Sequence, residues 1–151
     1  MMRKIERENT GLLHAGQDLV VAGYAGLAGT VKLAEAKEEE LSRWFSNEYM
    51  EEIAGCSRYL LREEKGFWSD CGAAEWEPAG KGGILTAIWN LTGAYETGVE
   101  FYLRQIPIRQ ETVEVCERLE LNPYRLYSRG CVLLTADNGG QLVRILAENH
   151  I

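Results

Sequence analysis

The chain has 151 residues, of which 46% are hydrophobic and 26% charged, and its 16 basic and 23 acidic residues give it a net charge of −7. This composition is typical of one globular domain and excludes a largely disordered chain. An acidic surface repels nucleic acids and anionic membranes, and the sequence has no basic patch interleaved with aromatic residues. We therefore expect neither nucleic acid nor a membrane among the partners.

The first residues and the cysteines indicate a cytoplasmic protein. Residues 1–8 (MMRKIERE) are charged and no apolar core follows them, as it would in a secretory leader. No apolar run approaches the ~20 residues that span a bilayer. The four cysteines lack the C-x-x-C spacing and only two histidines accompany them, so we expect reduced core thiols and no metal site. Residues 1–15 are expected to be a flexible lead-in to a domain over 16–151.

Strand and helix patterns alternate along the first half of the chain. The apolar run at 18–24 predicts a buried strand, and the apolar spacing from residue 30 predicts a helix. A second helix is expected to begin near Ser46 or Asn47, either of which can cap it. A loop then leads to a strand near 73–77. After the glycines at 80–83, a helix is expected from Ile84 to just before Gly98.

The second half continues this alternation. Apolar residues at every second position predict a half-buried strand over 99–103. The remaining predicted elements are a helix over 110–119, a break at Asn122-Pro123, a strand over 130–136, a turn over 137–140 and a last helix over 142–149. The predicted fold class is α+β with alternating strands and helices. Its mixed β-sheet has about four strands, covered by helices on at least one face.

The strongest candidate for a binding site is the loop of Gly80, Lys81, Gly82 and Gly83 in front of an apolar helix. Backbone N–H groups at a helix start, together with the helix dipole, favour an anion there. Glycines let a phosphate approach the backbone, and the lysine adds a positive charge. The stretch is not a P-loop, because glycine follows the lysine in place of Ser or Thr. The alternative is a strand-to-helix turn that uses glycine only for close packing.

Two other segments offer weaker candidates. Ser128 and Gly130 enter a predicted strand and can bind a polar ligand at a sheet edge, or simply form a turn capped by the serine. The glycines at 26–30 mark a second helix start, for which close packing is again the alternative. No catalytic set stands out, because His14 and His150 lie at opposite ends of the chain and no pair of carboxylates is singled out.

Several motifs together carry a family resemblance. They are GQDLVV at 16–21, GLAGT at 26–30, GGI at 82–84, IPIRQET at 106–112, LNPYRL at 121–126, Ser128-x-Gly130 and ADNG at 136–139. With them, nearly all of the chain from about residue 15 resembles the C-terminal domain of AIR synthase-related proteins, where AIR is aminoimidazole ribonucleotide. Within that superfamily it is most similar to hydrogenase expression/formation proteins of the HypE type.

The resemblance implies a two-domain plan. An N-terminal domain dimerises and holds ATP and magnesium through acidic residues, and a C-terminal α+β domain closes over the ligand. Residues 16–151 correspond to the C-terminal domain alone, so the chain by itself is expected to hold no cofactor. ATP and Mg²⁺ would require a separate ATP-binding domain. The chain also stops before the final strands and the cysteine tail expected of hydrogenase maturation factors.

One departure from the family motif bears on activity. These proteins commonly carry a His-Asp-x-Thr-Glu-Gly-Gly stretch in front of the helix. The matching residues here are EPAGKGG at 77–83, in which only Gly82 and Gly83 agree. We therefore expect a domain that binds a phosphate-bearing ligand or a partner without complete catalysis. The alternatives are a homodimer or larger structural assembly, or a decayed fragment, without a ligand, and the substrate-side subunit of an ATP-dependent, hydrogenase-maturation-like enzyme whose ATP-binding domain is encoded separately.

Overall fold

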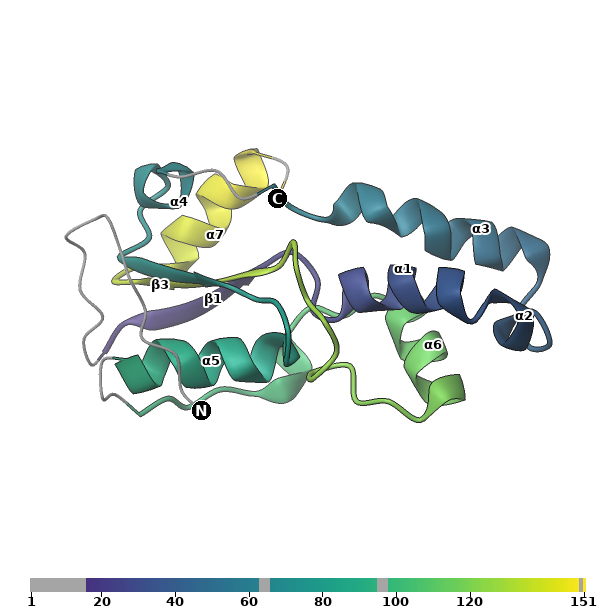
Figure 1. The fold of residues 1–151 in the computed structure, drawn as a ribbon. Helices are drawn as coiled ribbons and strands as arrows, with labels where there is room; N and C mark the ends of the chain where they lie inside the picture. Colours follow the sequence, from purple (N-terminus) through teal and green to yellow (C-terminus); the bar gives the residue numbers. More distant parts are fainter. Residues whose placement is uncertain (1–15, 63–65, 95–97, 150) are drawn as a thin grey trace.

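The computed structural model describes residues 16–62, 66–94, 98–149 and 151. The predicted lead-in at 1–15 lies outside these ranges, as do His14 and His150. The described residues form a small sheet with helices on both faces and a group of further helices beside it (Figure 1). None of the described helices combines the length and the apolar character needed to cross a lipid bilayer.

The described sheet has three strands in the order β1-β3-β2, and both pairs are antiparallel. The strands are β1 (Asp18–Ala22), β2 (Glu75–Pro78) and β3 (Val132–Ala136). Leu134 at the centre of β3 lies opposite Val20 of β1 on one side and opposite Trp76 of β2 on the other. Every residue of β3 is buried, because β3 has a strand on each side and helices over both faces.

Three of the predicted strands form, with ends shifted by a few residues, but the prediction of a mixed sheet of four strands is wrong. Residues 99–102 belong to no strand, and Leu103–Gln105 form a short 3₁₀ turn, η2. An alternating pattern forms a strand only where the apolar face becomes buried against a neighbour. Here Val99 and Leu103 remain 40% and 47% exposed, so burial does not stabilise a strand at this position.

The predicted helices form. Two short ones, at Glu38–Leu41 and Phe67–Asp70, were not predicted as separate helices. The helices are α1 (Leu27–Ala36), α2 (Glu38–Leu41), α3 (Asn47–Gly55), the 3₁₀ turn η1 (Cys56–Tyr59), α4 (Phe67–Asp70), α5 (Gly83–Ala94), α6 (Gln110–Leu119) and α7 (Gly139–Glu148). The helix predicted from residue 30 begins three residues earlier and is divided into α1 and α2 at Lys37.

Side-chain caps fix the starts of two helices. The Ser46 hydroxyl accepts a hydrogen bond from Tyr49 N at 3.1 Å, as a cap of α3 should. At α7, Asn138 Oδ1 accepts one from Gln141 N at 3.0 Å, and Asp18 Oδ2 accepts one from Gly139 N at 2.9 Å. These caps start α7 three residues before the predicted position, so part of the predicted turn at 137–140 belongs to the helix.

Two hydrophobic cores cover the two faces of the sheet. On one face α5 packs against Leu133, Val21 and Leu19, mainly through Ile84, Ala87, Ile88 and Leu91. On the other face α7 and α4 pack against Val20, Leu134 and Ala136, through Leu142, Leu146 and Trp68. Figure 1 shows these helices below and above the strands. Successive strand residues point to opposite faces, which explains how one strand supplies both cores.

The remaining helices form their own cluster beside the sheet. Helix α1 packs against α3 and α6 around Ala34, Leu41, Ile53 and Val115. Figure 1 shows this group on the right, with α1 pointing away from the sheet. A loop over 122–130 runs from the end of α6 back to β3. This loop contacts the starts of both α1 and α5 and therefore lies at the junction of the two groups.

Candidate functional site

The glycine-rich turn named from the sequence joins β2 to α5. The Gly80 carbonyl accepts hydrogen bonds from Gly83 N and from Ser128 N, both at 3.1 Å. Gly82 and Gly83 have φ values of +83° and +73°, in the left-handed region that favours glycine. Lys81 and Gly82 are exposed, whereas Gly83 is buried. The turn thus presents a lysine and the backbone of Gly82 to solvent at the start of a helix.

Close packing accounts for one of these glycines. A β-carbon on Gly83 would overlap the carbonyl oxygen of Tyr124 and come within 2.8 Å of Arg125 Cα. In the same place Leu85 N donates to Tyr124 O at 3.2 Å. The amides of Gly83 and Leu85 therefore already have partners in the protein. An anion at this helix start would use the exposed donors of the turn, which are the amide of Gly82 and the ammonium of Lys81.

Ser128 and Gly130 have structural partners. The buried Ser128 hydroxyl accepts a hydrogen bond from Gly26 N at 2.8 Å and donates one to Leu126 O at 2.7 Å. Gly130 has a φ of +87°, and a β-carbon there would lie 2.9 Å from Leu60 Cβ. These contacts agree with the turn interpretation of this segment. The Ser128 amide also donates to Gly80 O, while its hydroxyl accepts from Gly26 N. The glycine-bearing segments at 26–30 and 80–83 therefore both meet the loop over 122–130, which contains Ser128 and Gly130.

The glycines at 26–30 lie at a closed helix start. Residues 25–30 are all buried, and Gly29 N donates to Tyr127 O at 2.9 Å. A β-carbon on Gly29 would come within 3.0 Å of that same carbonyl. Packing explains this segment. Of the two glycine-bearing helix starts named from the sequence, the start of α5 is the one that solvent reaches.

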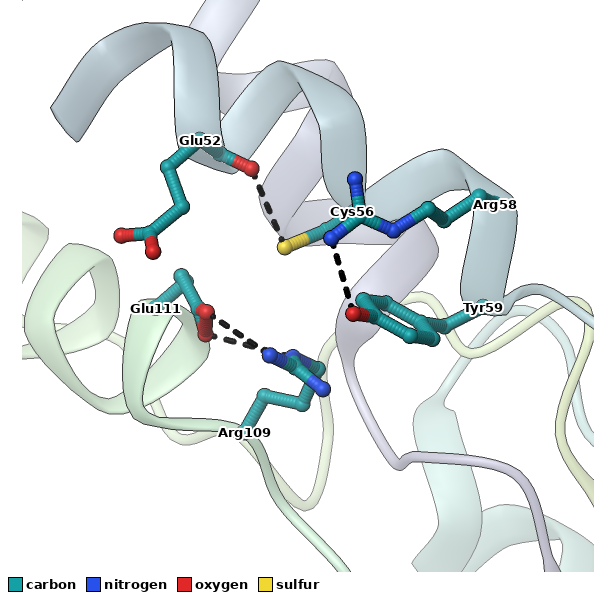
Figure 2. A network of polar contacts seen from close by, with 6 residues as sticks. All are labelled: Glu52, Cys56, Arg58, Tyr59, Arg109 and Glu111. Atoms are coloured by element: carbon teal, nitrogen blue, oxygen red, sulfur yellow. Dashed lines mark hydrogen bonds and ion pairs between the residues drawn. The ribbon is translucent and has the colours of Figure 1, made fainter. Parts of the chain in front are cut away.

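Sequence reasoning missed a polar cluster around Arg109, which Figure 2 shows from close by. Arg109 caps the start of α6, and its Nε and Nη2 donate to the two carboxylate oxygens of Glu111 at 3.3 and 3.2 Å. The guanidinium carbon lies 4.1 Å from the ring centre of Tyr59 and 5.3 Å from that of Tyr24. Arg109 therefore ties α6, η1 and the end of β1 together through one ion pair and two cation–π contacts.

The electrostatics of this cluster are those of a stable ion pair. Burial raises the pKa of Glu111, but the hydrogen bonds and charge of Arg109 outweigh it and hold the pKa below its ordinary value. The hydrogen bond to Glu111 raises the pKa of Arg109 in turn. Cys56 donates through Sγ to Glu52 O at 3.3 Å, and burial followed by the charge of Glu111 raises its pKa. A buried thiol whose pKa is raised is a poor nucleophile.

A second arginine lies on the solvent side of the cluster. Arg58 donates through Nη2 to Tyr59 Oη at 2.8 Å, and its guanidinium carbon lies 4.7 Å from the centre of that ring (Figure 2). It lines a cavity of about 430 Å³ together with Tyr24 and Tyr59. Arg109 and Glu111 stand in the IPIRQET motif, which is the sequence signal closest to this cluster. Nothing in the sequence pairs them with Tyr24 or Tyr59, which are far away along the chain.

The described side chains include no candidate metal centre. Among residues 16–62, 66–94, 98–149 and 151, no three histidine, cysteine, aspartate or glutamate side chains gather closely enough to hold a metal ion. The polar groups of the cluster are an ion pair, tyrosines and a protonated thiol. This arrangement can position a helix and bind an anion at Arg58.

Comparison with known proteins gives a match in structure and none in sequence. No family model and no curated protein matches the chain. Two crystal structures of E. coli HypE, described as a hydrogenase maturation protein, match with TM-scores of 0.65 and 0.67 at 19% identity, over 93% of this chain and 42% of theirs. A HypE–HypF complex matches with a TM-score of 0.63 at 14% identity, over 91% of this chain and 44% of that one.

These similarities establish the fold. At 14–19% identity, the residues that act in HypE cannot be assigned to this chain. The chain also spans less than half the length of the HypE chains that it matches. Its fold is therefore similar to part of HypE, a hydrogenase maturation protein.

Proposed function

We propose that the chain is a binding domain of the AIR synthase and HypE type that holds a phosphate-bearing ligand at the turn of Gly80, Lys81, Gly82 and Gly83 and is not a complete catalyst alone. The observation that carries this proposal is the solvent-accessible start of α5. It combines an exposed lysine with two left-handed glycines, and the first turn of α5 contains no acidic residue that would satisfy the helix dipole internally.

The surrounding contacts support a pre-formed turn. Gly80 O holds the turn closed through Gly83 N and Ser128 N, and Thr86 Oγ1 donates to Gly82 O at 3.0 Å. A ligand that meets a fixed backbone loses less conformational entropy on binding than one that must order a loop. Ser128 supports this turn through its backbone amide, whereas Gly130 packs against Leu60, and the ligand itself would contact Lys81 and the amide of Gly82.

A thermal-shift and calorimetric titration tests the proposal with inorganic phosphate and ADP as probes. A ligand that binds only the folded state raises the melting temperature as its concentration increases. We expect such a shift in the wild-type chain and its loss in Lys81→Ala. Lys37→Ala is the matched control, because Lys37 is an exposed lysine in the helical group far from the turn. The absence of any shift, or a shift that Lys81→Ala leaves unchanged, would refute the proposal.

A second candidate is the substrate-side subunit of an ATP-dependent enzyme whose ATP and Mg²⁺ are held by a separate domain. It is favoured by α5, which has no charged side chain among its 12 residues and leaves Trp89 64% exposed. A tryptophan exposed on an uncharged helix is suited to contact with another protein surface. A homodimer would cover it equally well. Sedimentation of the chain at increasing concentration, alone and with a candidate ATP-binding domain, separates the two, and a monomer in every mixture would refute both.

A further inference from the structure

The outer edge of β1 has no strand beside it among the described residues, since β3 pairs with its inner edge. Two cavities follow this outer edge in succession. One of about 820 Å³ is lined by residues 16–21, and one of about 430 Å³ is lined by residues 20–24. Four residues line both cavities: Val20, Val21, Pro107 and Val143. The two cavities therefore form one edge groove that accompanies β1 along its whole length.

Apolar side chains line both walls of the edge groove. One wall is the segment over 98–102, where Tyr102 is 64% exposed, and the other is α7, where Val143 is 53% exposed. Large hydrophobic side chains that gather at a groove mark a binding surface. Because β1 lies between these walls, its edge is more accessible to a single extended segment than to the sheet of a second copy.

The two edges of the sheet differ in their protection. β2 carries Pro78, which has no N–H to offer to another strand. β1 has the sequence DLVVA, with no proline and no lysine to discourage pairing. Natural proteins protect sheet edges with such residues or cover them, because an open edge pairs readily with other chains. An apolar edge without these residues is suited to accept a strand.

Charge distinguishes the two ends of the edge groove. Among the residues that line the cavity at the Gly16 end, the charged ones are Asp18 and Glu100. Among the described residues that line the Tyr24 end, Arg58 carries the charged side chain. Both carboxylates are exposed, and Asp18 also accepts a hydrogen bond from Gly139 N. The groove is therefore acidic at one end, apolar in the middle and basic at the other.

We infer that the edge groove binds an extended segment of a partner polypeptide, which adds to the outer edge of β1 as a further strand. Its middle residues are apolar, a basic residue lies at the Asp18 end, and an acidic side chain or a terminal carboxylate lies at Arg58. Main-chain hydrogen bonds to β1 supply affinity, and alternate side chains facing the two walls supply specificity. This site is separate from the turn at Gly80 to Gly83 and does not depend on phosphate binding there.

The test is selection from a displayed library of random peptides of about ten residues, the length that extended backbone needs to follow residues 16–24. We expect the selected peptides to alternate apolar residues between a basic and an acidic end. Val143→Arg should weaken their binding roughly tenfold or more, since it places a charge in the apolar wall. Val113→Arg is the matched control, because Val113 is 41% exposed on α6, away from the groove.

Two further measurements distinguish strand addition from other binding. Arg58→Glu should lower affinity for the selected peptides, and replacing the acidic end of the peptide with a basic residue should restore that affinity. Methylation of the peptide amides that donate to β1 should abolish binding, whereas methylation of the alternate amides should not. Peptides without a charge pattern, or binding that is indifferent to Val143→Arg or to methylation, would overturn the inference. So would a dimer of the chain that Val143→Arg dissociates.

Discussion

Ser128 Oγ accepts a hydrogen bond from Gly26 N at 2.8 Å, across 102 positions of the chain. Both residues are buried, and the same hydroxyl donates to Leu126 O at 2.7 Å. Ser128 N donates in addition to Gly80 O. One serine therefore holds the starts of α1 and α5 to the same loop, which makes it the residue that joins the helical group to the sheet.

Replacement of Ser128 by alanine should destabilise the fold. It leaves the amide of Gly26 buried without its acceptor, and an unsatisfied buried donor costs about 1–3 kcal/mol. The free energy of unfolding from urea titration measures this loss. Ser57→Ala is the control, because Ser57 is exposed on η1 and should lose no more than about 0.5 kcal/mol. Equal effects of the two substitutions would contradict the role assigned to Ser128.

Alanine at Gly83 and at Gly80 should have opposite consequences. Gly83 has a φ of +73°, and a β-carbon there would overlap Tyr124 O, so Gly83→Ala should cost at least about 2 kcal/mol. Nothing lies within 4 Å of the same position on Gly80, whose φ is not in the left-handed region. Gly80→Ala should therefore stay within about 0.5 kcal/mol. Denaturant unfolding of both variants measures the difference, and a stable Gly83→Ala would show that the turn can rearrange.

Strands β1 and β3 were predictable because each is a local apolar run that becomes buried, whereas β2 consists of Glu75-Trp76-Glu77-Pro78 and shows no such run. The pattern at 99–103 fails for a reason the sequence does not contain, since Phe101 packs against the core but Val99 and Leu103 stay exposed. Helix α4 is too short to display a helical period. The glycine turn was visible as a motif. Whether Gly83 serves packing or binding depends on Tyr124, a contact that only the folded chain creates.

The Arg109 cluster was hidden for the same physical reason. Its ion pair to Glu111 spans two positions and lies within a recognisable motif. The two tyrosine rings that stack with the guanidinium come from β1's end and from η1, which are brought together by tertiary packing. Long-range contacts of this kind carry no signature in a single sequence.

The difference in stability between the wild type and Glu111→Gln should depend on pH in a defined direction. The folded pKa of Glu111 lies below its unfolded value of about 4.3, so the folded state favours the charged form. The stabilisation is fully present above the unfolded pKa and is lost as the pH falls through the folded pKa. Glu111→Gln should thus be less stable than the wild type near neutral pH, and this difference should shrink in acid. Unfolding curves from pH 7 downward measure it.

The control for this prediction lies on the same helix. Glu117 is exposed on α6, and Glu117→Gln should change stability little at either pH. A difference between wild type and Glu111→Gln that is constant with pH would mean that Glu111 acts through packing and not through its charge. That result would contradict the ion-pair explanation of how Arg109 is held.

The four cysteines should resist thiol reagents until the protein unfolds. All four are free and buried. Burial raises the pKa of Cys131 to about 12 and that of Cys116 to about 11, and it also raises the pKa of Cys56 and of Cys71. The thiolate is the reactive form, so native protein at pH 8 should react slowly with a disulfide reagent and denatured protein should react quickly at four sites. Rapid labelling of one thiol in the native chain would show local opening. Cys71, in the loop after α4, is the residue to examine first, because Cys71→Ala would then remove the fast phase and leave the other three slow.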